Sequence, residues 1–198
     1  MKNILLFLLF VLFATVINSF AQTTIDSVRF YIKDTSGVLK ANNTDNCYVV
    51  EFSGKSASEL YTNVLSSIAT LYKNPDKVLS KVDNVSITIS GTALDVPVPK
   101  DASEIDSVFP QENNYYGFDY TFSLQFKDGK IRINAPVIDV ESILWANIFN
   151  GGKYKLVAPQ FAGIHFNNSS DKITISFQKY LNELIQTIIK KSETVNNW

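Results

Sequence analysis

The sequence is poor in the residues that catalytic and metal sites use most often. It contains one histidine and one cysteine in 198 residues, which excludes a disulfide within the chain and a metal site with two imidazole ligands. His165 stands in the apolar stretch GIHF, where we expect a packed, hydrogen-bonded ring. Cys47 opens the β-rich run CYVVEF and is expected to be a buried thiol, with an intermolecular disulfide as the alternative.

An excess of positive charge is also missing. The chain has 18 Lys and Arg residues against 19 Asp and Glu residues, a formal net charge of −1, and no segment gathers the basic residues into a stripe. Nucleic-acid-binding domains usually show such a stripe and a basic balance. The sequence therefore predicts no nucleic-acid partner.

Short motifs that carry catalytic chemistry are incomplete. GlyGlyLys at 151–153 is followed by Tyr154, where a phosphate-binding loop has Ser or Thr to hold Mg²⁺. SerSerAspLys at 169–172 matches one motif of the penicillin-binding enzymes, but their other two motifs are absent. The sequence predicts no enzyme, no metal and no cofactor. The alternative is a hydrolase that uses the carboxylates around 101–106 or 139–141.

The first 21 residues have the features of an export signal. Lys2 precedes an apolar run from Ile4 to Ile17, and SerPheAla at 19–21 supplies a small-residue cleavage site. The run is shorter than the ~20 residues that cross a membrane, and Gln22, the expected first mature residue, excludes a lipoprotein. We expect residues 1–21 to be removed, no membrane span afterwards, and a periplasmic or extracellular protein.

The remaining residues, 22–198, are predicted to form a single α+β domain. Alternation of apolar and polar residues predicts strands at 28–32, 48–53, 78–82, 85–90, 116–126 and 130–134. Apolar residues at three-and-four spacing predict helices that run to Tyr72 from a cap at Ser56 or Ser58, over 140–148, and over about 174–193. Residues 173–177 are alternatively the start of a strand. The proline-rich and acidic segment 95–114 is predicted to be a long loop.

These elements predict a curved antiparallel sheet packed on a long C-terminal helix, in the order β-α-β-β-β-β-α. The core is expected to comprise residues 46–138 and the helix at 174–193. The most strongly alternating segment places a row of large apolar residues on one face, and AspGly at 128–129 predicts a tight hairpin after it.

Three segments of the sequence resemble a known family. They are GKSASELYTNVLSSIATLY at 54–72, NVSITISGTA at 84–93 and YTFSLQFKDGKIRI at 120–133. They resemble an uncharacterised envelope family of the Bacteroides group, a domain of unknown function with a fold like that of the TATA-box-binding protein (TBP). The resemblance covers about 48–138 and implies a TBP-like or helix-grip-like sheet. It implies no activity, because fold and function separate readily.

The aromatic density suggests one place for a ligand. The row from Tyr116 to Phe126 faces one side of its strand, so it fills the core or lines a hollow between the sheet and the final helix. We expect the core role. The candidate ligand-binding residues are Tyr116, Tyr120, Phe122 and Ile185.

The expected function is non-enzymatic binding or interaction in the cell envelope, with an unknown envelope protein as the partner. The alternative is a carrier or sensor of a small apolar ligand held between the sheet and the C-terminal helix. AspSerVal at 26–28 and 106–108 also resembles the short O-glycosylation sites of exported Bacteroides-group proteins.

Overall fold

The computed structural model describes residues 25–34, 36–42, 45–99, 113–147, 155–157 and 172–194. The predicted export signal, the central part of the predicted loop, the acids at 101–106 and His165 lie outside these residues.

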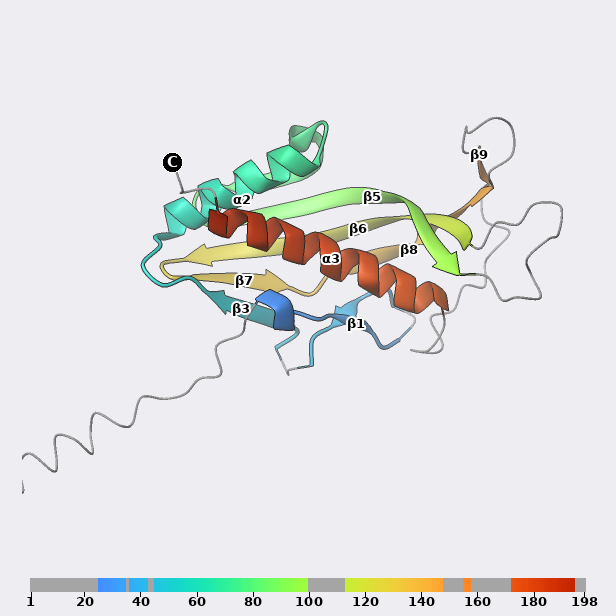
Figure 1. Cartoon of the computed structure of the whole chain (residues 1–198), viewed down its shortest axis with the longest axis horizontal. Helices are drawn as coiled ribbons and strands as arrows, with labels where there is room; N and C mark the ends of the chain where they lie inside the picture. The colour runs from blue at the N-terminus through green and yellow to red at the C-terminus, as the bar shows by residue number, and fades with distance from the viewer. Residues whose placement is uncertain are drawn as a thin grey trace, which may run out of the picture.

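The described chain is an α+β fold built on a seven-stranded antiparallel sheet (Figure 1). Its main path runs in the order β3-β7-β6-β5-β4, and β8 and β9 extend it beside the first half of β6. The strands are β3 (Cys47–Glu51), β4 (Leu79–Val82), β5 (Ser86–Pro99), β6 (Asn113–Lys127), β7 (Lys130–Asn134), β8 (Val137–Asn147) and β9 (Lys155–Val157). A separate two-stranded sheet pairs β1 (Tyr31–Ile32) with β2 (Leu39–Lys40).

Two α-helices, α2 (Ala57–Leu71) and α3 (Lys172–Thr194), pack on one face of this sheet (Figure 1). Short 3-10 turns, η1 (Ile25–Ser27) and η2 (Pro75–Lys77), precede β1 and β4. The predicted fold class is confirmed: an antiparallel sheet packs against a long C-terminal helix. None of the helices in the described ranges combines the length and the apolar character needed to cross a membrane.

Helix α2 begins where the sequence predicts. The Ser56 hydroxyl accepts a hydrogen bond from the Glu59 amide at 3.3 Å, and the Glu59 carboxylate accepts one from the Ser56 amide at 2.8 Å. This capping box satisfies two amides that a helix leaves without partners. The buried side is the predicted apolar stripe, which includes Leu60, Val64 and Ile68.

The helix predicted at 140–148 is wrong, because residues 140–147 belong to strand β8 and residue 148 lies outside the described ranges. Val137–Asp139 pair with Asp119–Thr121, and Leu144–Ala146 pair with Tyr115–Gly117, so β8 carries extra residues between the two paired stretches. This bulge shifts the phase of the side chains, and Ile138 and Ile143 are both buried although they are five residues apart. A strand with a bulge thus shows the spacing of apolar residues that is typical of a helix.

The loop predicted at 95–114 is wrong at both ends, where residues 95–99 belong to β5 and residues 113–114 belong to β6. Strand β5 continues to Pro99 and pairs Val96 with Tyr116, after a register shift that follows Ala93. Asp95 at this shift has a φ of 59°, a left-handed conformation that Asp tolerates better than most residues. The prolines that led to the prediction of a loop therefore lie in a strand, in the part that follows the bulge.

Residues 28–32 lie along α3, and only Tyr31 and Ile32 form a strand. The Asn182 side chain accepts a hydrogen bond from the Phe30 amide at 2.8 Å and donates one to its carbonyl at 3.0 Å. Gln178 accepts from the Ile32 amide at 2.6 Å, and Gln186 donates to the Val28 carbonyl at 2.9 Å. Three side-chain amides, spaced one helical turn apart on α3, thus form the hydrogen bonds that a neighbouring strand would otherwise form with this segment. We call them the amide ladder.

Candidate functional site

The four predicted ligand-binding residues lie in or against the hydrophobic core. Tyr120, Phe122 and Ile185 are 3%, 2% and 1% exposed, and Tyr116 is half-buried. The rings of Tyr120 and Phe122 stack with centroids 6.2 Å apart, and Tyr116 meets Phe177 of α3 edge-on at 6.2 Å. Cys47 is buried, as predicted.

A cluster of tyrosine hydroxyls fills the space between the sheet and the two helices. The Tyr120 hydroxyl lies 2.7 Å from that of Tyr72, the C-cap residue of α2, and its ring contacts the ring of Tyr180 on α3. Burial raises the pKa of all three hydroxyls, Tyr120 most strongly, so they stay protonated at neutral pH. Because the hydroxyls form hydrogen bonds with one another, they do not require a water-filled cavity to supply partners.

Tyr120 is also packed tightly against its cross-strand neighbour, Gly91. A Cβ atom at Gly91 would lie 2.7 Å from the Tyr120 hydroxyl oxygen and 2.9 Å from ring carbon Cζ. The tyrosine ring therefore covers the glycine backbone and takes the space of a side chain. Packing this close supports the core role of the aromatic row.

Within the described ranges no helix packs on the opposite face of the sheet, and we call it the open face. The strand register places on it a row of hydroxyl and amide side chains, Ser86, Thr88, Ser90, Thr92, Thr121, Ser123, Gln125 and Asn134. Hydrogen bonds join neighbours across the strands: Ser90 to Thr121 at 2.9 Å and Asn134 to Ser123 at 2.8 Å. The open face is therefore polar but carries few charges along its middle.

A groove of about 700 Å³ crosses the open face over β5, β6 and β8. Its lining includes the hydroxyls of Ser90 and Thr121 and the partly exposed side chains of Val137 and Val140. Tyr120 also borders the groove, and it alone among the four predicted residues does so. The combination of hydroxyls, carboxylates and aliphatic side chains suits contact with a polar and partly apolar partner.

Carboxylates gather at the β8 side of the groove. Asp119 accepts a hydrogen bond from the Thr92 hydroxyl at 2.5 Å, and its own amide donates to the Ser142 hydroxyl at 2.7 Å. The Asp139 carboxylate accepts from the Glu141 amide at 3.0 Å. The Asp139 carboxylate thus takes part in the bulge, whereas the Asp119 carboxylate is held by Thr92 of β5.

In the described ranges, no three His, Cys, Asp or Glu side chains come close enough together to bind a metal ion. Among the described residues that line the groove, Lys77 alone has a positive side chain.

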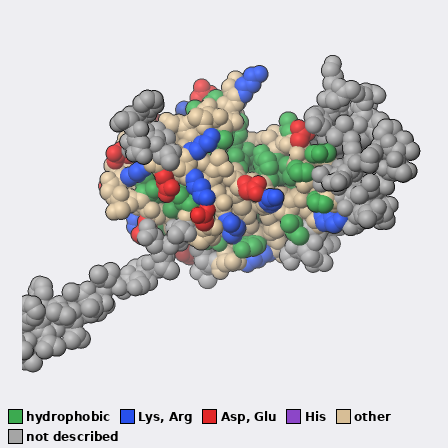
Figure 2. Space-filling view, in the orientation of Figure 1, with side chains coloured by type: hydrophobic (Ala, Val, Ile, Leu, Met, Phe, Trp, Pro, Cys, Tyr) green, Lys and Arg blue, Asp and Glu red, His purple; other side chains and the backbone are tan. Residues whose placement is uncertain are grey.

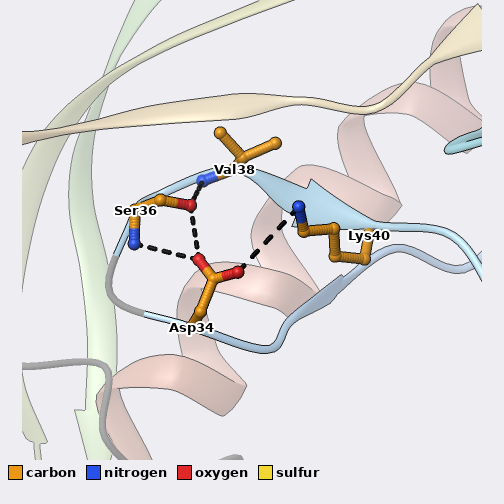
Figure 3. Close-up of polar contacts among 4 residues, drawn as sticks. All are labelled: Asp34, Ser36, Val38 and Lys40. Atoms are coloured by element: carbon orange, nitrogen blue, oxygen red, sulfur yellow. Dashed lines mark hydrogen bonds and ion pairs between the residues drawn. The ribbon is translucent and has the colours of Figure 1, made fainter.

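Ser36 forms part of one wall of the groove, and its polar contacts involve Asp34 and Val38, with Lys40 beside Asp34 (Figure 3). The Asp34 carboxylate accepts hydrogen bonds from the amide and the hydroxyl of Ser36. Its Oδ2 atom lies 3.9 Å from Nζ of Lys40. The hydrogen bonds from Ser36, with a smaller effect of Lys40, lower the pKa of Asp34. The Ser36 hydroxyl in turn accepts from the Val38 amide at 3.3 Å. The wall is therefore fixed by its own hydrogen bonds.

The turn is fastened to β8. The Ile138 amide donates to the Gly37 carbonyl at 2.8 Å, and the Leu39 amide donates to the Pro136 carbonyl at 2.8 Å. A side chain at Gly37 would strike the Ile138 carbonyl at 2.2 Å, so only glycine allows this approach.

A second cavity, of about 560 Å³, opens on the helix face beside the start of α3. Figure 2 shows hydrophobic side chains gathered there, and the cavity is lined by Val96, Pro97, Ile175 and Tyr180. Ile175 is 48% exposed.

Sequence reasoning did not identify the groove. The sequence predicts only that the polar sides of two strands face solvent, with Ser90, Thr92, Asp119 and Thr121 on them. The alternation of apolar and polar residues gives no sign of a groove. The groove is lined by residues of five segments that lie far apart in the sequence, at 36, 77–78, 90–92, 119–121 and 137–141.

Comparisons with known proteins give similarity in structure only. No family model matches the sequence, and no curated protein matches it. A TBP-like protein from Parabacteroides distasonis is similar with a TM-score of 0.46 and 15% identity, over 75% of this chain and 92% of that one. A member of the DUF4468 family from Bacteroides ovatus is similar with a TM-score of 0.48 and 8% identity, over 84% of this chain and 93% of that one. Neither similarity brings a ligand, a partner or an activity to this chain.

Proposed function

We propose that this chain is an exported, non-enzymatic protein that binds a partner in the cell envelope through the open face of its sheet. One observation carries the proposal. Both helices pack on the same side of the sheet, and the uncovered side bears a groove of about 700 Å³ with fixed walls. A rigid concave surface binds with little loss of conformational freedom, which favours recognition.

The side chains around the groove support a protein partner. Val137 is 41% exposed and Val140 38% exposed, and hydroxyls surround them. Protein interfaces commonly combine an apolar centre with a polar rim that forms hydrogen bonds. The proposal of export rests on the sequence of residues 1–21.

The carrier alternative has less support. Its ligand would lie between the sheet and α3, where Phe118 and Phe177 approach to 4.2 Å between ring centroids. Phe177, Leu181 and Ile185 are at most 1% exposed, so side chains already occupy this interface. The hydrolase alternative relied in part on Asp139 and Glu141, and the Asp139 carboxylate is engaged by the Glu141 amide within the bulge.

Site-specific photo-crosslinking in the organism that carries the gene tests the proposal. A photoreactive amino acid replaces Val137 on the open face, and in a matched variant it replaces Leu71, a similarly exposed aliphatic residue on α2. We expect a discrete cross-linked partner from position 137 and none from position 71. Equal cross-linking from both positions, or none from 137, would contradict the proposal.

Export is tested on the same material. We expect the protein recovered from the periplasm or the medium to begin at Gln22, as measured by intact mass. A protein that keeps residues 1–21 and remains in the cytoplasm contradicts this part of the proposal.

A further inference from the structure

A third cavity lies on the open face at the hairpin end of β6, away from the groove. It has a volume of about 440 Å³ and is lined by Lys127, Lys130 and Arg132 together with Val49, Val85 and Gln125. The three cations come from both strands of the β6–β7 hairpin, and the apolar residues come from β3, from the turn before β5 and, with Phe126, from β6. We call it the basic cavity.

Its positive charges are not compensated within the described chain. None of the three cations lies within 4 Å of a carboxylate in the described ranges. Lys127 and Lys130 face each other directly across the strands, and like charges in this arrangement repel. Glu51 is the nearest acid by register, opposite Lys130 on β3, and it forms no ion pair with it. The cavity therefore has a positive potential that a bound anion would neutralise.

The backbone that carries these charges is held in place. The Gly129 amide donates to the Lys55 carbonyl at 2.7 Å, and the Phe52 amide donates to the Gly129 carbonyl at 2.7 Å. The Asp128 carboxylate accepts a hydrogen bond from the Ala57 amide at the start of α2, at 2.8 Å. Because the hairpin is anchored on both sides, the cations are presented from a preformed frame.

The basic cavity and the groove share one face. Alternation along β6 places Lys127 on the same side as Gln125, Ser123, Thr121 and Asp119. At a rise of about 3.3 Å per residue, roughly 26 Å separate Lys127 from Asp119. The open face thus carries positive charge at one end, carboxylates at the other, and neutral polar side chains between them.

We propose that the basic cavity binds an acidic, partly apolar peptide segment of the protein partner. This inference rests on the proposed function and deepens it, because it names the chemistry of the partner at one end of the open face. Carboxylates of the segment pair with Lys127, Lys130 and Arg132, and its apolar side chains contact Val49 and Val85. Complementary charge also fixes the direction in which the partner lies along β6.

The test uses the exported protein and a fluorescent peptide of alternating glutamate and valine, with a glutamine-for-glutamate peptide as the control probe. Binding is measured by anisotropy at low salt and at high salt. We expect only the acidic peptide to bind, and high salt to weaken it. We expect the double variant Lys127→Gln/Lys130→Gln to bind about tenfold more weakly, since each exposed ion pair contributes up to ~1 kcal/mol.

The matched control is Lys33→Gln/Lys73→Gln, which removes the same charge from exposed lysines outside the cavity. This variant should bind as the unmodified protein does. Equal weakening in both double variants, equal binding of both peptides, or full displacement of the peptide by inorganic phosphate at equal concentration would overturn the inference. If the peptide fails to bind while position 137 still cross-links, the inference fails and the proposed function stands.

Discussion

At Gly91 the sheet has no space for a side chain. The Tyr120 ring lies over this glycine and is held there by the Tyr72 hydroxyl and by the stacked ring of Phe122. A new methyl group must displace a ring that is fixed from two sides. Forcing extra atoms into a well-packed core costs about 1–3 kcal/mol.

We therefore expect Gly91→Ala to lower the free energy of unfolding by about 1–3 kcal/mol, as measured by urea denaturation. The hydroxyl oxygen of Tyr120 is the nearest obstacle, so the same substitution should cost less when Tyr120 is replaced by Phe. An identical cost in the two backgrounds would show that the close approach to the hydroxyl is not the cause.

At the scale of elements, α3 does more than cover the sheet. Its amide ladder binds the backbone of residues 28–32, and Asn182 is the central member, only 8% exposed. Truncation of Asn182 leaves the Phe30 amide and carbonyl without partners in a buried setting. An unsatisfied buried group costs about 1–3 kcal/mol.

Asn182→Ala should therefore lower the free energy of unfolding by about 2 kcal/mol or more. It should also accelerate hydrogen exchange at the Phe30 amide in particular. A general loss of stability would not act on this amide specifically. Glu183→Gln, on the exposed neighbouring position, serves as the control and should leave exchange at Phe30 unchanged.

The start of α2 gives the fold a dependence on acid pH. Hydrogen bonds from the Ser56 amide and hydroxyl lower the pKa of Glu59 below its ordinary 4.5. Because the folded pKa is the lower one, this contribution to stability is complete above the unfolded pKa and disappears as the pH falls through the folded pKa.

The stability advantage of the unmodified protein over Glu59→Gln should accordingly be largest near neutral pH and should vanish well below pH 4.5, in denaturation experiments across that range. A difference that stays constant with pH would contradict the assignment of the lowered pKa to the capping box. Ser56→Ala should reduce the same pH dependence and cost about 1 kcal/mol near neutral pH.

At the scale of the whole molecule, the sheet and both helices share one packed core. Phe122 is at the centre of β6 and is 2% exposed. Phe122→Ala should lower the free energy of unfolding by about 3–5 kcal/mol, because truncation of a packed ring leaves a cavity. Gln125→Ala, on the open face of the same strand, should change it by less than about 0.5 kcal/mol. A small cost at Phe122 would instead favour a pre-existing hollow and revive the carrier alternative.

Much of the fold could be predicted because its signals are local. The Ser56 cap, the apolar stripe of α2, the hairpin at 128–129 and the helix now seen as α3 each depend on residues within a few positions of one another. The strand β8 was missed for the same reason. Its bulge exists only through pairing with β6, and without that pairing its apolar spacing matches a helix.

The candidate site was less predictable than the fold. Sequence patterns identified the large apolar row and placed a ligand near it, at Tyr116, Tyr120, Phe122 and Ile185. The groove and the basic cavity instead lie on the opposite face of the same strand, among residues that any exposed strand face would have.

By itself, the sequence determined which segments form regular elements and which face of each strand is apolar, since periodicity and capping act over a few residues. Only the tertiary structure decided that Lys127, Lys130 and Arg132 meet beside Val49, and that Ser36 lines a groove together with residues of β5, β6 and β8. These arrangements arise from strand register and bulges, which join positions far apart in the chain and leave no periodic trace in it.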